Sequence, residues 1–210
     1  KFSSISNVMG KLKGFNKNYL QTTVIMIFFL IVSTNGMGQE NLSFDFQEIP
    51  RHDPFEDRQG PYYHKVYLTF SNDGLTFNDL GKLLFDKVSV PDVVRFRDGR
   101  IGIYAVDGSH RSRSGIIVAL SEDEGKSWNQ GSLQLKPNMA GGADPDAVLL
   151  GDGRIRLYYI RFSGRPVPGE MPRGENSVHS AVSSDGIHFV EEEGIRYRQE
   201  QITDPDVVKI

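Results

Sequence analysis

The chain has 210 residues, of which 38% are hydrophobic and 24% are charged, and it contains 22 glycines and no cysteine. This composition excludes a wholly disordered chain, a collagen and a multi-span membrane protein, and the lack of cysteine excludes disulfides, thiolate zinc sites and a cysteine nucleophile. Four of the 24 basic residues and none of the acids precede residue 40, so the remainder carries 20 basic and 27 acidic residues, a net charge of −7. An acidic body argues against general binding to nucleic acids or anionic membranes, although it is compatible with a local basic pocket.

Residues 1–39 have the pattern of a secretory signal peptide with some residues upstream of it. Three lysines between residues 11 and 17 precede an apolar run over residues 24–32, and small and polar residues follow this run. The run is shorter than the roughly 20 apolar residues that span a bilayer, so an N-terminal anchor helix is the weaker alternative. We expect cleavage near Gly38–Gln39, export to the periplasm or the extracellular space, and no stable membrane anchor afterwards.

The remainder, residues 40–210, is built on an internal repeat. Its first marker is a proline followed by an aspartate at the start of a β-rich run, with prolines 54 and then 60 residues apart: Val90-Pro91-Asp92, Asp144-Pro145-Asp146 and Asp204-Pro205-Asp206. After the first two copies comes an Asp-Gly pair, Asp98-Gly99 and Asp152-Gly153, and then a run rich in Ile, Leu and Tyr. Asp-Gly between two β-rich runs predicts a hairpin with a type I′ turn, in which both central residues have a positive φ. We expect the second strands over residues 101–106 and 155–160.

A second marker recurs between the copies of the first. Each copy reads Ser-x-Asp, then Gly, then an aromatic residue, and follows a predicted strand; the copies span residues 71–77, 121–128 and 183–189, after strands over 65–70, 116–120 and 178–182. The Ser and Asp side chains can accept hydrogen bonds from the backbone of a tight turn, and Gly can take a positive φ. The aromatic residue is expected to pack back between the strands.

One period therefore contains four antiparallel strands in about 50–60 residues, which is typical of a propeller blade. We predict an all-β chain, a β-propeller of four-stranded blades, with about two full blades and two partial ones over 64–210. The alternative is a β-sandwich, but sandwiches do not repeat turn chemistry in register. Since a closed ring takes at least four blades, we also expect the reading frame to be truncated.

The residues of these markers resemble two groups of propeller glycosidases. Ser121 to Trp128 resembles the Asp-box, or BNR repeat, of sialidases, Ser-x-Asp-x-Gly-x-x-Trp, whereas the other two copies are one residue shorter and end in Phe. The Asp-Pro-Asp starts look more like the arabinanase, xylosidase and invertase group. These resemblances imply five or six blades in a complete ring and a carbohydrate substrate. The Phe/Tyr-Arg-Ile-Pro motif of sialidases is missing, which argues against sialidase activity specifically.

Strand alternation places the starts of the innermost strands and the long loops on one face, so their carboxylates converge at the mouth of the central channel. Two carboxylates with different pKa values suit glycoside hydrolysis. The arabinanase-like resemblance implies a base Asp, a pKa-tuning Asp and an acid Glu in this region. We predict Asp144, Asp204 and Glu175 as the catalytic residues; the alternative for the two aspartates is a structural role, in which each accepts backbone N–H bonds from a neighbouring blade.

Basic side chains on the same face suit a substrate that carries a carboxylate. The predicted substrate-binding residues are Asp92, His110, Arg111, Arg113, Arg161 and Arg165. We expect no cofactor and no metal, because no histidine pair has metal-ligand spacing and no phosphate-binding or nucleophile-elbow motif is present. The function predicted is that of an exported glycosidase; the alternative is a non-catalytic propeller that binds a glycan or a protein.

Overall fold

The computed structural model describes residues 51–77, 81–137, 141–164 and 174–208, all of which belong to one unit, Leu42–Ile210. Within these residues the secondary structure consists of β-strands and one short 3₁₀ helix, η1 (Pro61–Tyr63). The predicted all-β class is confirmed. The predicted signal peptide lies outside the described residues.

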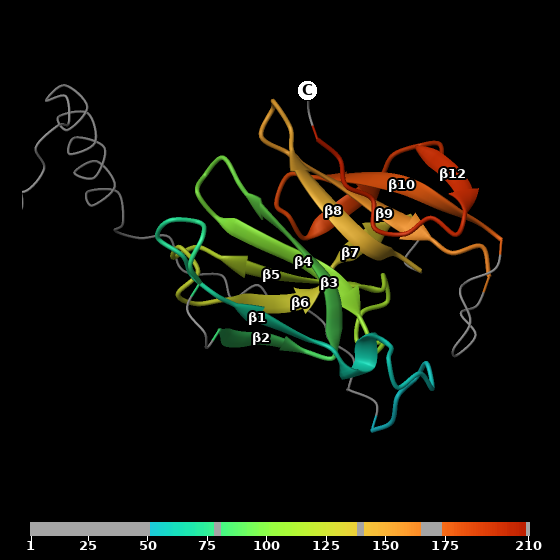
Figure 1. Ribbon diagram of the computed structural model, residues 1–210. Helices are drawn as coiled ribbons and strands as arrows, with labels where there is room; N and C mark the ends of the chain where they lie inside the picture. The colour runs from blue at the N-terminus through green and yellow to red at the C-terminus, as the bar shows by residue number, and fades with distance from the viewer. Residues whose placement is uncertain (1–50, 78–80, 138–140, 165–173, 209–210) are drawn as a thin grey trace, which may run out of the picture. The chain divides into compact units, whose positions relative to one another are not determined.

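Four antiparallel strands in chain order form the middle sheet: β3 (Val88–Arg95), β4 (Ile101–Asp107), β5 (Ile116–Ser121) and β6 (Asn129–Ser132). Figure 1 shows these strands in green to yellow, with β3 at the edge nearest to β8. Strands β4 and β5 begin at the residues that the sequence predicts. Turn chemistry sets one end of each strand, because the Asp-Gly pair ends just before β4 begins and the Ser-x-Asp marker starts where β5 ends.

The C-terminal sheet repeats this order with β8 (Ala143–Leu149), β9 (Ile155–Arg161), β10 (Glu175–Ser183) and β11 (His188–Glu191). Two further strands join it: β12 (Tyr197–Glu200) pairs antiparallel with the first half of β10, and β7 (Gln134–Lys136) pairs parallel with β11. The chain leaves the middle sheet at β6 and enters the outer edge of the C-terminal sheet at β7. This crossing ties the two sheets together through backbone hydrogen bonds, for example from the amide of Gln134 to the carbonyl of Ile187 at 2.9 Å.

A third, smaller sheet consists of β1 (Lys65–Leu68) and β2 (Lys82–Asp86). The middle sheet lies between this pair and the C-terminal sheet (Figure 1). Strand β5 is therefore buried on both sides: Ile116, Val118 and Leu120 pack toward the C-terminal sheet, whereas Ile117 and Ala119 pack toward β1 and β2. Burial on both faces explains why β5 reads as a continuous apolar run without polar alternation.

In all three Ser-x-Asp turns the serine hydroxyl donates to the aspartate and accepts the amide of the glycine. In the third, the Ser183 hydroxyl donates to Asp185 Oδ1 at 2.9 Å and accepts from the amide of Gly186 at 2.8 Å, while Asp185 Oδ1 also accepts from the amides of Ile187 and His188. Gly186 has a φ of 85°. Phe189 is buried in the core, whereas Phe77 of the first turn is exposed. The predicted packing of the aromatic residue is thus confirmed for the third turn and is wrong for the first.

The Asp-Gly turns differ from the prediction of type I′ geometry. Only the glycine has a positive φ, 96° at Gly99 and 93° at Gly153. In the first turn the Gly99 amide donates to the Phe96 carbonyl at 3.1 Å and the Phe96 amide donates to the Arg100 carbonyl at 2.8 Å. This is a three-residue loop with a type I turn followed by a left-handed glycine. The carboxylate of Asp98 accepts the amide of Arg100, which favours this conformation over a positive φ at Asp98.

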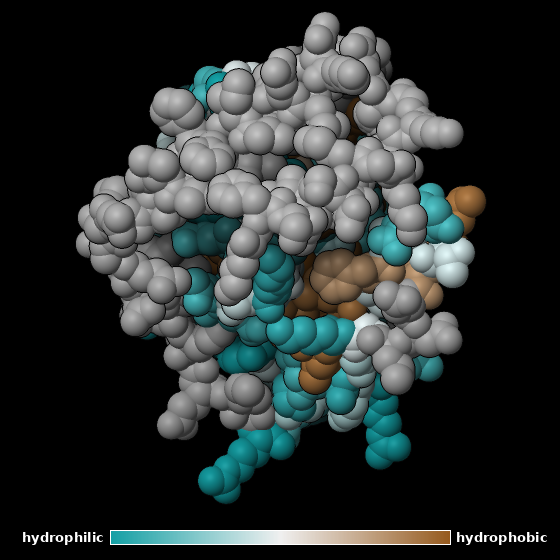
Figure 2. Space-filling model, turned by 90° about the vertical axis from the view of Figure 1, so that its left-hand side faces the viewer, coloured by the Kyte–Doolittle hydropathy of each residue, from teal (hydrophilic) through white to brown (hydrophobic). Residues whose placement is uncertain are grey.

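Both kinds of turn lie on the same side of the sheets, as the sequence predicts. The Arg100 guanidinium reaches from the turn after β3 to the carbonyl of Asp185 in the turn after β10, at 3.0 Å. Figure 2 views the left-hand side of Figure 1, where mainly hydrophilic side chains surround a smaller hydrophobic area. The loop that joins β4 to β5 is on the opposite side, together with the starts of β3 and β8.

Candidate functional site

Strands β3 and β8, the first strands of the two four-strand repeats, start with the same kink. The strand register shifts between Ser89 and Asp92 in β3 and between Ala143 and Asp146 in β8. Each shift surrounds a proline, which has no N–H to donate to the ladder. The residue before each proline has a left-handed backbone, with φ of 46° at Val90 and 47° at Asp144, and Asp204 repeats it at 49°.

This kink places the side chains of Val90 and Asp144 on the wall of one cavity. Asp144 is 8% exposed, and its Oδ2 accepts a hydrogen bond from the backbone amide of Asp204 at 3.4 Å. The contact brings two of the predicted catalytic residues together. It also shows the backbone contact that the structural alternative for Asp144 requires.

The cavity has a volume of about 640 Å³. Three of the predicted site residues lie on its wall: Asp144, His110 and Arg113. Most of the remaining wall is apolar, with a few polar groups among it, which is the usual character of a small-molecule site. The other residues that line it are Phe55, Asp57, Pro61, Ser89, Val90, Val106, Asp107, Ser112, Gly115, Gly141, Gly142, Ala143 and Phe162.

The loop between β4 and β5 is held by a buried carboxylate. Asp107 is 2% exposed; it accepts hydrogen bonds from the amide and hydroxyl of Ser109 and, at 2.6 Å, from the amide of Ser112. A carboxylate with three donors fixes the loop that connects them. The loop therefore presents His110 and Arg113 to the cavity from a defined backbone.

A second segment of the wall comes from residues 51–61, which lie outside the repeat. The carboxylate of Asp53 accepts the amides of Phe55 and Asp57, each at 2.8 Å. Phe55 contacts the ring of His110 edge to face, with 4.5 Å between the ring centres. The sequence analysis missed this segment because it belongs to neither marker. The local signal for this segment is Asp53, which precedes by two and four residues the amides whose hydrogen bonds it accepts.

Burial raises the pKa of Asp144 to about 6, and the negative charge of Asp204 adds to this effect against the opposing hydrogen bond from the Asp204 amide. The pKa of Asp146 also rises to about 6, through burial and then the charge of Asp92. A carboxyl that titrates near pH 6 is partly protonated close to neutral pH, so it can donate a proton as well as accept one.

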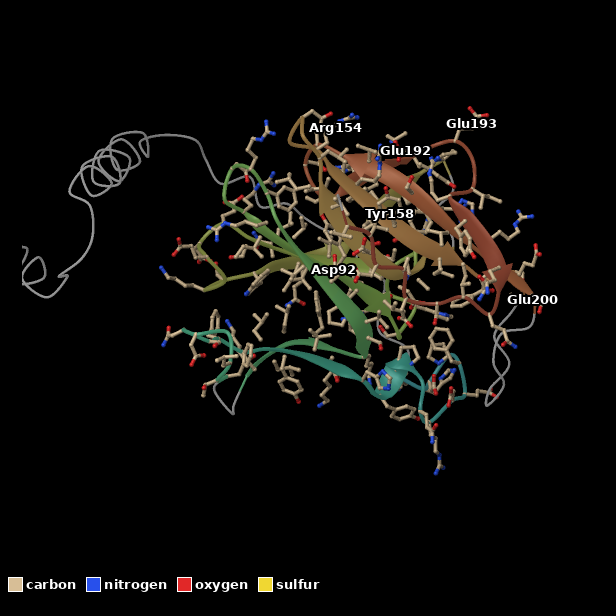
Figure 3. All side chains as sticks on the ribbon, turned by 45° about the horizontal axis from the view of Figure 1, so that its top comes forward. Asp92, Arg154, Tyr158, Glu192, Glu193 and Glu200 are labelled. Carbon is tan, nitrogen blue, oxygen red and sulfur yellow. The ribbon has the colours of Figure 1, made fainter. Side chains whose placement is uncertain are left out.

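Asp92 and Asp146 each contact the backbone at the start of the next copy of the first marker. Asp92 Oδ2 accepts the amide of Ala147 at 2.7 Å, and Asp146 Oδ2 accepts the amide of Val207 at 3.2 Å. Figure 3 shows Asp92 on β3 where this strand meets the C-terminal sheet. Asp92, predicted to bind substrate, is therefore engaged in holding β3 to β8.

The other predicted site residues lie away from the cavity wall. Arg111 donates to the Ser109 hydroxyl and to the Asp86 carbonyl. Arg161 forms a two-point ion pair with Glu191, at 2.7 and 2.9 Å. Glu175 is exposed at the start of β10 and lies 3.9 Å from Arg198. Arg165 lies outside the described residues.

The described part of the chain contains neither a candidate metal centre nor a helix that could span a membrane. No group of three or more His, Asp or Glu side chains there is arranged to hold a metal ion. No helix there has the length and apolar character needed to cross a membrane.

No protein-family model matches the chain, and no curated protein sequence matches it. Its fold is similar to the crystal structure of a protein of unknown function from Dyadobacter fermentans DSM 18053, with a TM-score of 0.45 and 19% sequence identity. The match covers 59% of this chain and 42% of that protein, so the chain spans less than half of its length.

Proposed function

We propose that the protein is an exported, propeller-type glycoside hydrolase in which Asp144 supplies the proton for cleavage of a glycosidic bond. The observation that carries this proposal is a buried carboxyl on the wall of a 640 Å³ cavity with its pKa raised to about 6. Acid catalysis of glycoside cleavage needs such a group, because it must hold a proton near neutral pH and release it to the leaving oxygen.

The proposed reaction uses two carboxyl groups. Asp144 donates its proton to the glycosidic oxygen as the bond from this oxygen to the anomeric carbon breaks. A water molecule forms the new bond to that carbon, and its proton passes to a second carboxylate. Asp204 is the proposed partner, since its backbone contacts Asp144 directly; Asp57 on the cavity wall is the other candidate.

The propeller is supported by the repetition of one sheet. Two sheets share a strand order and turn chemistry, pack face to face through one core, and join at their inner strands through Asp92 and Ala147. An experimental structure tests this arrangement: successive sheets should be related by rotation about an axis next to β3 and β8. Stacking by translation would contradict it.

The activity test is turnover of a panel of aryl glycosides, including arabinosides, by the full chain. Asp144→Asn should lower kcat/KM at least about 100-fold, the usual contribution of a general acid. Asp152→Asn is the matched control, because this exposed aspartate lies in the Asp-Gly turn on the opposite side of the sheet. The wild-type rate should fall as the pH rises through about 6, since the acid must be protonated. Full activity of Asp144→Asn would overturn the assignment.

The second candidate function is non-catalytic binding of a glycan or a protein at the same cavity. The contact between Asp144 and the Asp204 amide favours it, because a carboxylate that accepts a backbone amide can be purely structural. Saccharide binding without turnover of any aryl glycoside would support this function. Export is tested by the mass of the mature protein outside the cytoplasm, which should lack about the first 38 residues if cleavage occurs at the small-residue site.

A further inference from the structure

We propose that the cavity binds a saccharide that carries an anionic group, with the guanidinium of Arg113 holding the anion and the Phe55 ring packing on the sugar. This inference rests on the proposed function in one respect only, namely that the ligand of the cavity is a carbohydrate. Carboxylate and sulfate share the chemistry that Arg113 would recognise: a planar fork of N–H donors fits two oxygens of either group.

The structure separates Arg113 from the other predicted arginines by their contacts. Arg161 is neutralised by Glu191, and Arg111 is engaged with the Ser109 hydroxyl and the Asp86 carbonyl. Arg113 lies on the cavity wall, and no described residue forms an ion pair or a hydrogen bond with its guanidinium. Its charge is thus available to a ligand.

The backbone that carries Arg113 is fixed on both sides. Ser112 donates to the Ile116 carbonyl at 2.7 Å and contacts the hydroxyl of Ser132 at 2.7 Å, and Ser114 donates to the Leu133 carbonyl at 2.8 Å. Because Ser112 and Ser114 are buried, the residue between them is directed outward. A guanidinium on a fixed backbone loses less conformational freedom when it binds an anion.

The wall of this cavity also carries aromatic rings. Phe55 lies edge to face on His110, and Phe162 lines the same cavity. The C–H groups on one face of a pyranose ring form an apolar surface that packs on aromatic rings. Asp53 holds Phe55 by capping the amides of residues 55 and 57. We therefore assign Asp53 as the positioning residue of this wall.

The test is isothermal titration of the full chain with three methyl glycosides that differ at one carbon: glucuronide, glucoside and glucoside 6-sulfate. The wild type should bind at least one anionic sugar about tenfold more tightly than the neutral glucoside. Arg113→Gln should remove this preference and leave the affinity for the glucoside within about twofold, and Arg113→Lys should restore part of it. Arg95→Gln is the matched control, because Arg95 is exposed on β3 and outside the cavity wall.

The outcomes distinguish this inference from the proposed function. Tighter binding of the glucuronide or of the sulfate identifies which anion the site takes. Equal binding of all three sugars, binding of none, or an equal loss in the Arg95→Gln variant would overturn the anion site. If the preference depends on Arg113 while no aryl glycoside is cleaved, the anion site stands and the catalytic proposal fails. Urea unfolding of each variant checks that a loss of binding is not a loss of folding.

Discussion

The carboxylate of Asp92 accepts a hydrogen bond from the backbone amide of Ala147, which lies 55 residues later in the chain. Asp146 repeats this contact with the amide of Val207. The aspartates after the first two prolines therefore each join the start of one copy of the marker to the start of the next. This role accounts for the aspartate in these two copies.

Replacement of Asp92 tests the contact. Asp92→Ala leaves the amide of Ala147 without its partner, so the free energy of unfolding should fall by about 1–2 kcal/mol. Asp92→Asn keeps an oxygen that can accept the amide, and it removes a carboxyl whose pKa is raised by burial. The asparagine variant should thus be at least as stable as the wild type at pH 7. Urea unfolding measures both, and an equal loss in the two variants would contradict the hydrogen-bond explanation.

The kink before the first proline is strained by its side chain. Val90 has a φ of 46°, and a β-branched residue is disfavoured in the left-handed region where asparagine is tolerated. Val90→Asn should therefore raise the free energy of unfolding by about 1 kcal/mol. Val93→Asn is the control, because Val93 is exposed on the same strand outside the kink; it should not stabilise the protein.

The strands of the repeat could be predicted because turn chemistry marks one end of each strand and a β-rich run follows or precedes the turn. The parallel pairing of β7 with β11 could not. Strand β7 has three residues, and its partner lies more than 50 residues away. Backbone pairing of this kind leaves no pattern of side chains. The predicted type of the Asp-Gly turns was also wrong. The choice between a two-residue and a three-residue loop depends on the twist and register of the strands.

Part of the candidate site could likewise be predicted from the sequence, and part of it could not. Strand direction alone placed Asp144, His110 and Arg113 on one face, and the structure brings these three to one cavity. The same reasoning could not separate Arg113 from Arg161, because the partner of Arg161 is a side chain on another strand. Phe55 was missed because its position depends on how a segment outside the repeat folds against the loop that carries His110.

The third Ser-x-Asp turn packs against the middle sheet through its glycine. A Cβ atom on Gly186 would overlap the ring of Phe96, and Gly186 has a φ of 85°. Gly186→Ala should thus lower the free energy of unfolding by about 3 kcal/mol or more, from overpacking together with strain. Gly74→Ala in the first turn isolates the strain, since no atom lies within 4 Å of its Cβ; it should cost about 1 kcal/mol. Equal losses would show that the contact with Phe96 relaxes freely.

The aspartates of the third and first Ser-x-Asp turns can be compared in the same way. Burial opposes the ionisation of Asp185, but hydrogen bonds from the amides of His188 and Ile187 outweigh it and lower its pKa to about 2. Asp185→Ala should cost about 1–3 kcal/mol at pH 7, because it leaves two amides of a partly buried turn unpaired. The loss should shrink as the pH falls from about 4 to 2, where the wild-type carboxylate becomes protonated. Asp73→Ala in the exposed first turn should cost less, and urea unfolding at pH 7 and pH 3 measures both.

The pKa of Asp144 is raised, whereas that of Asp185 is lowered, so the dependence of stability on pH has the opposite sign. This dependence distinguishes a catalytic from a structural role for Asp144. Its pKa in the folded protein is about 6, above the ordinary value of 3.8, so folding disfavours its ionised form. The stabilisation of the protonated form is present below about pH 4 and is lost as the pH rises through 6.

Asp144→Asn cannot ionise, so at pH 7 it should unfold with a free energy on the order of 2 kcal/mol higher than the wild type, while its activity is lost. At pH 4 the two proteins should be equally stable. Asp152→Asn is the control, because the hydrogen bond from the amide of Arg154 lowers the pKa of Asp152 in the wild type. This variant should not be more stable than the wild type at pH 7. A structural carboxylate at position 144 predicts the reverse result, a variant that is less stable than the wild type at pH 7 because the charged acceptor of the Asp204 amide is gone.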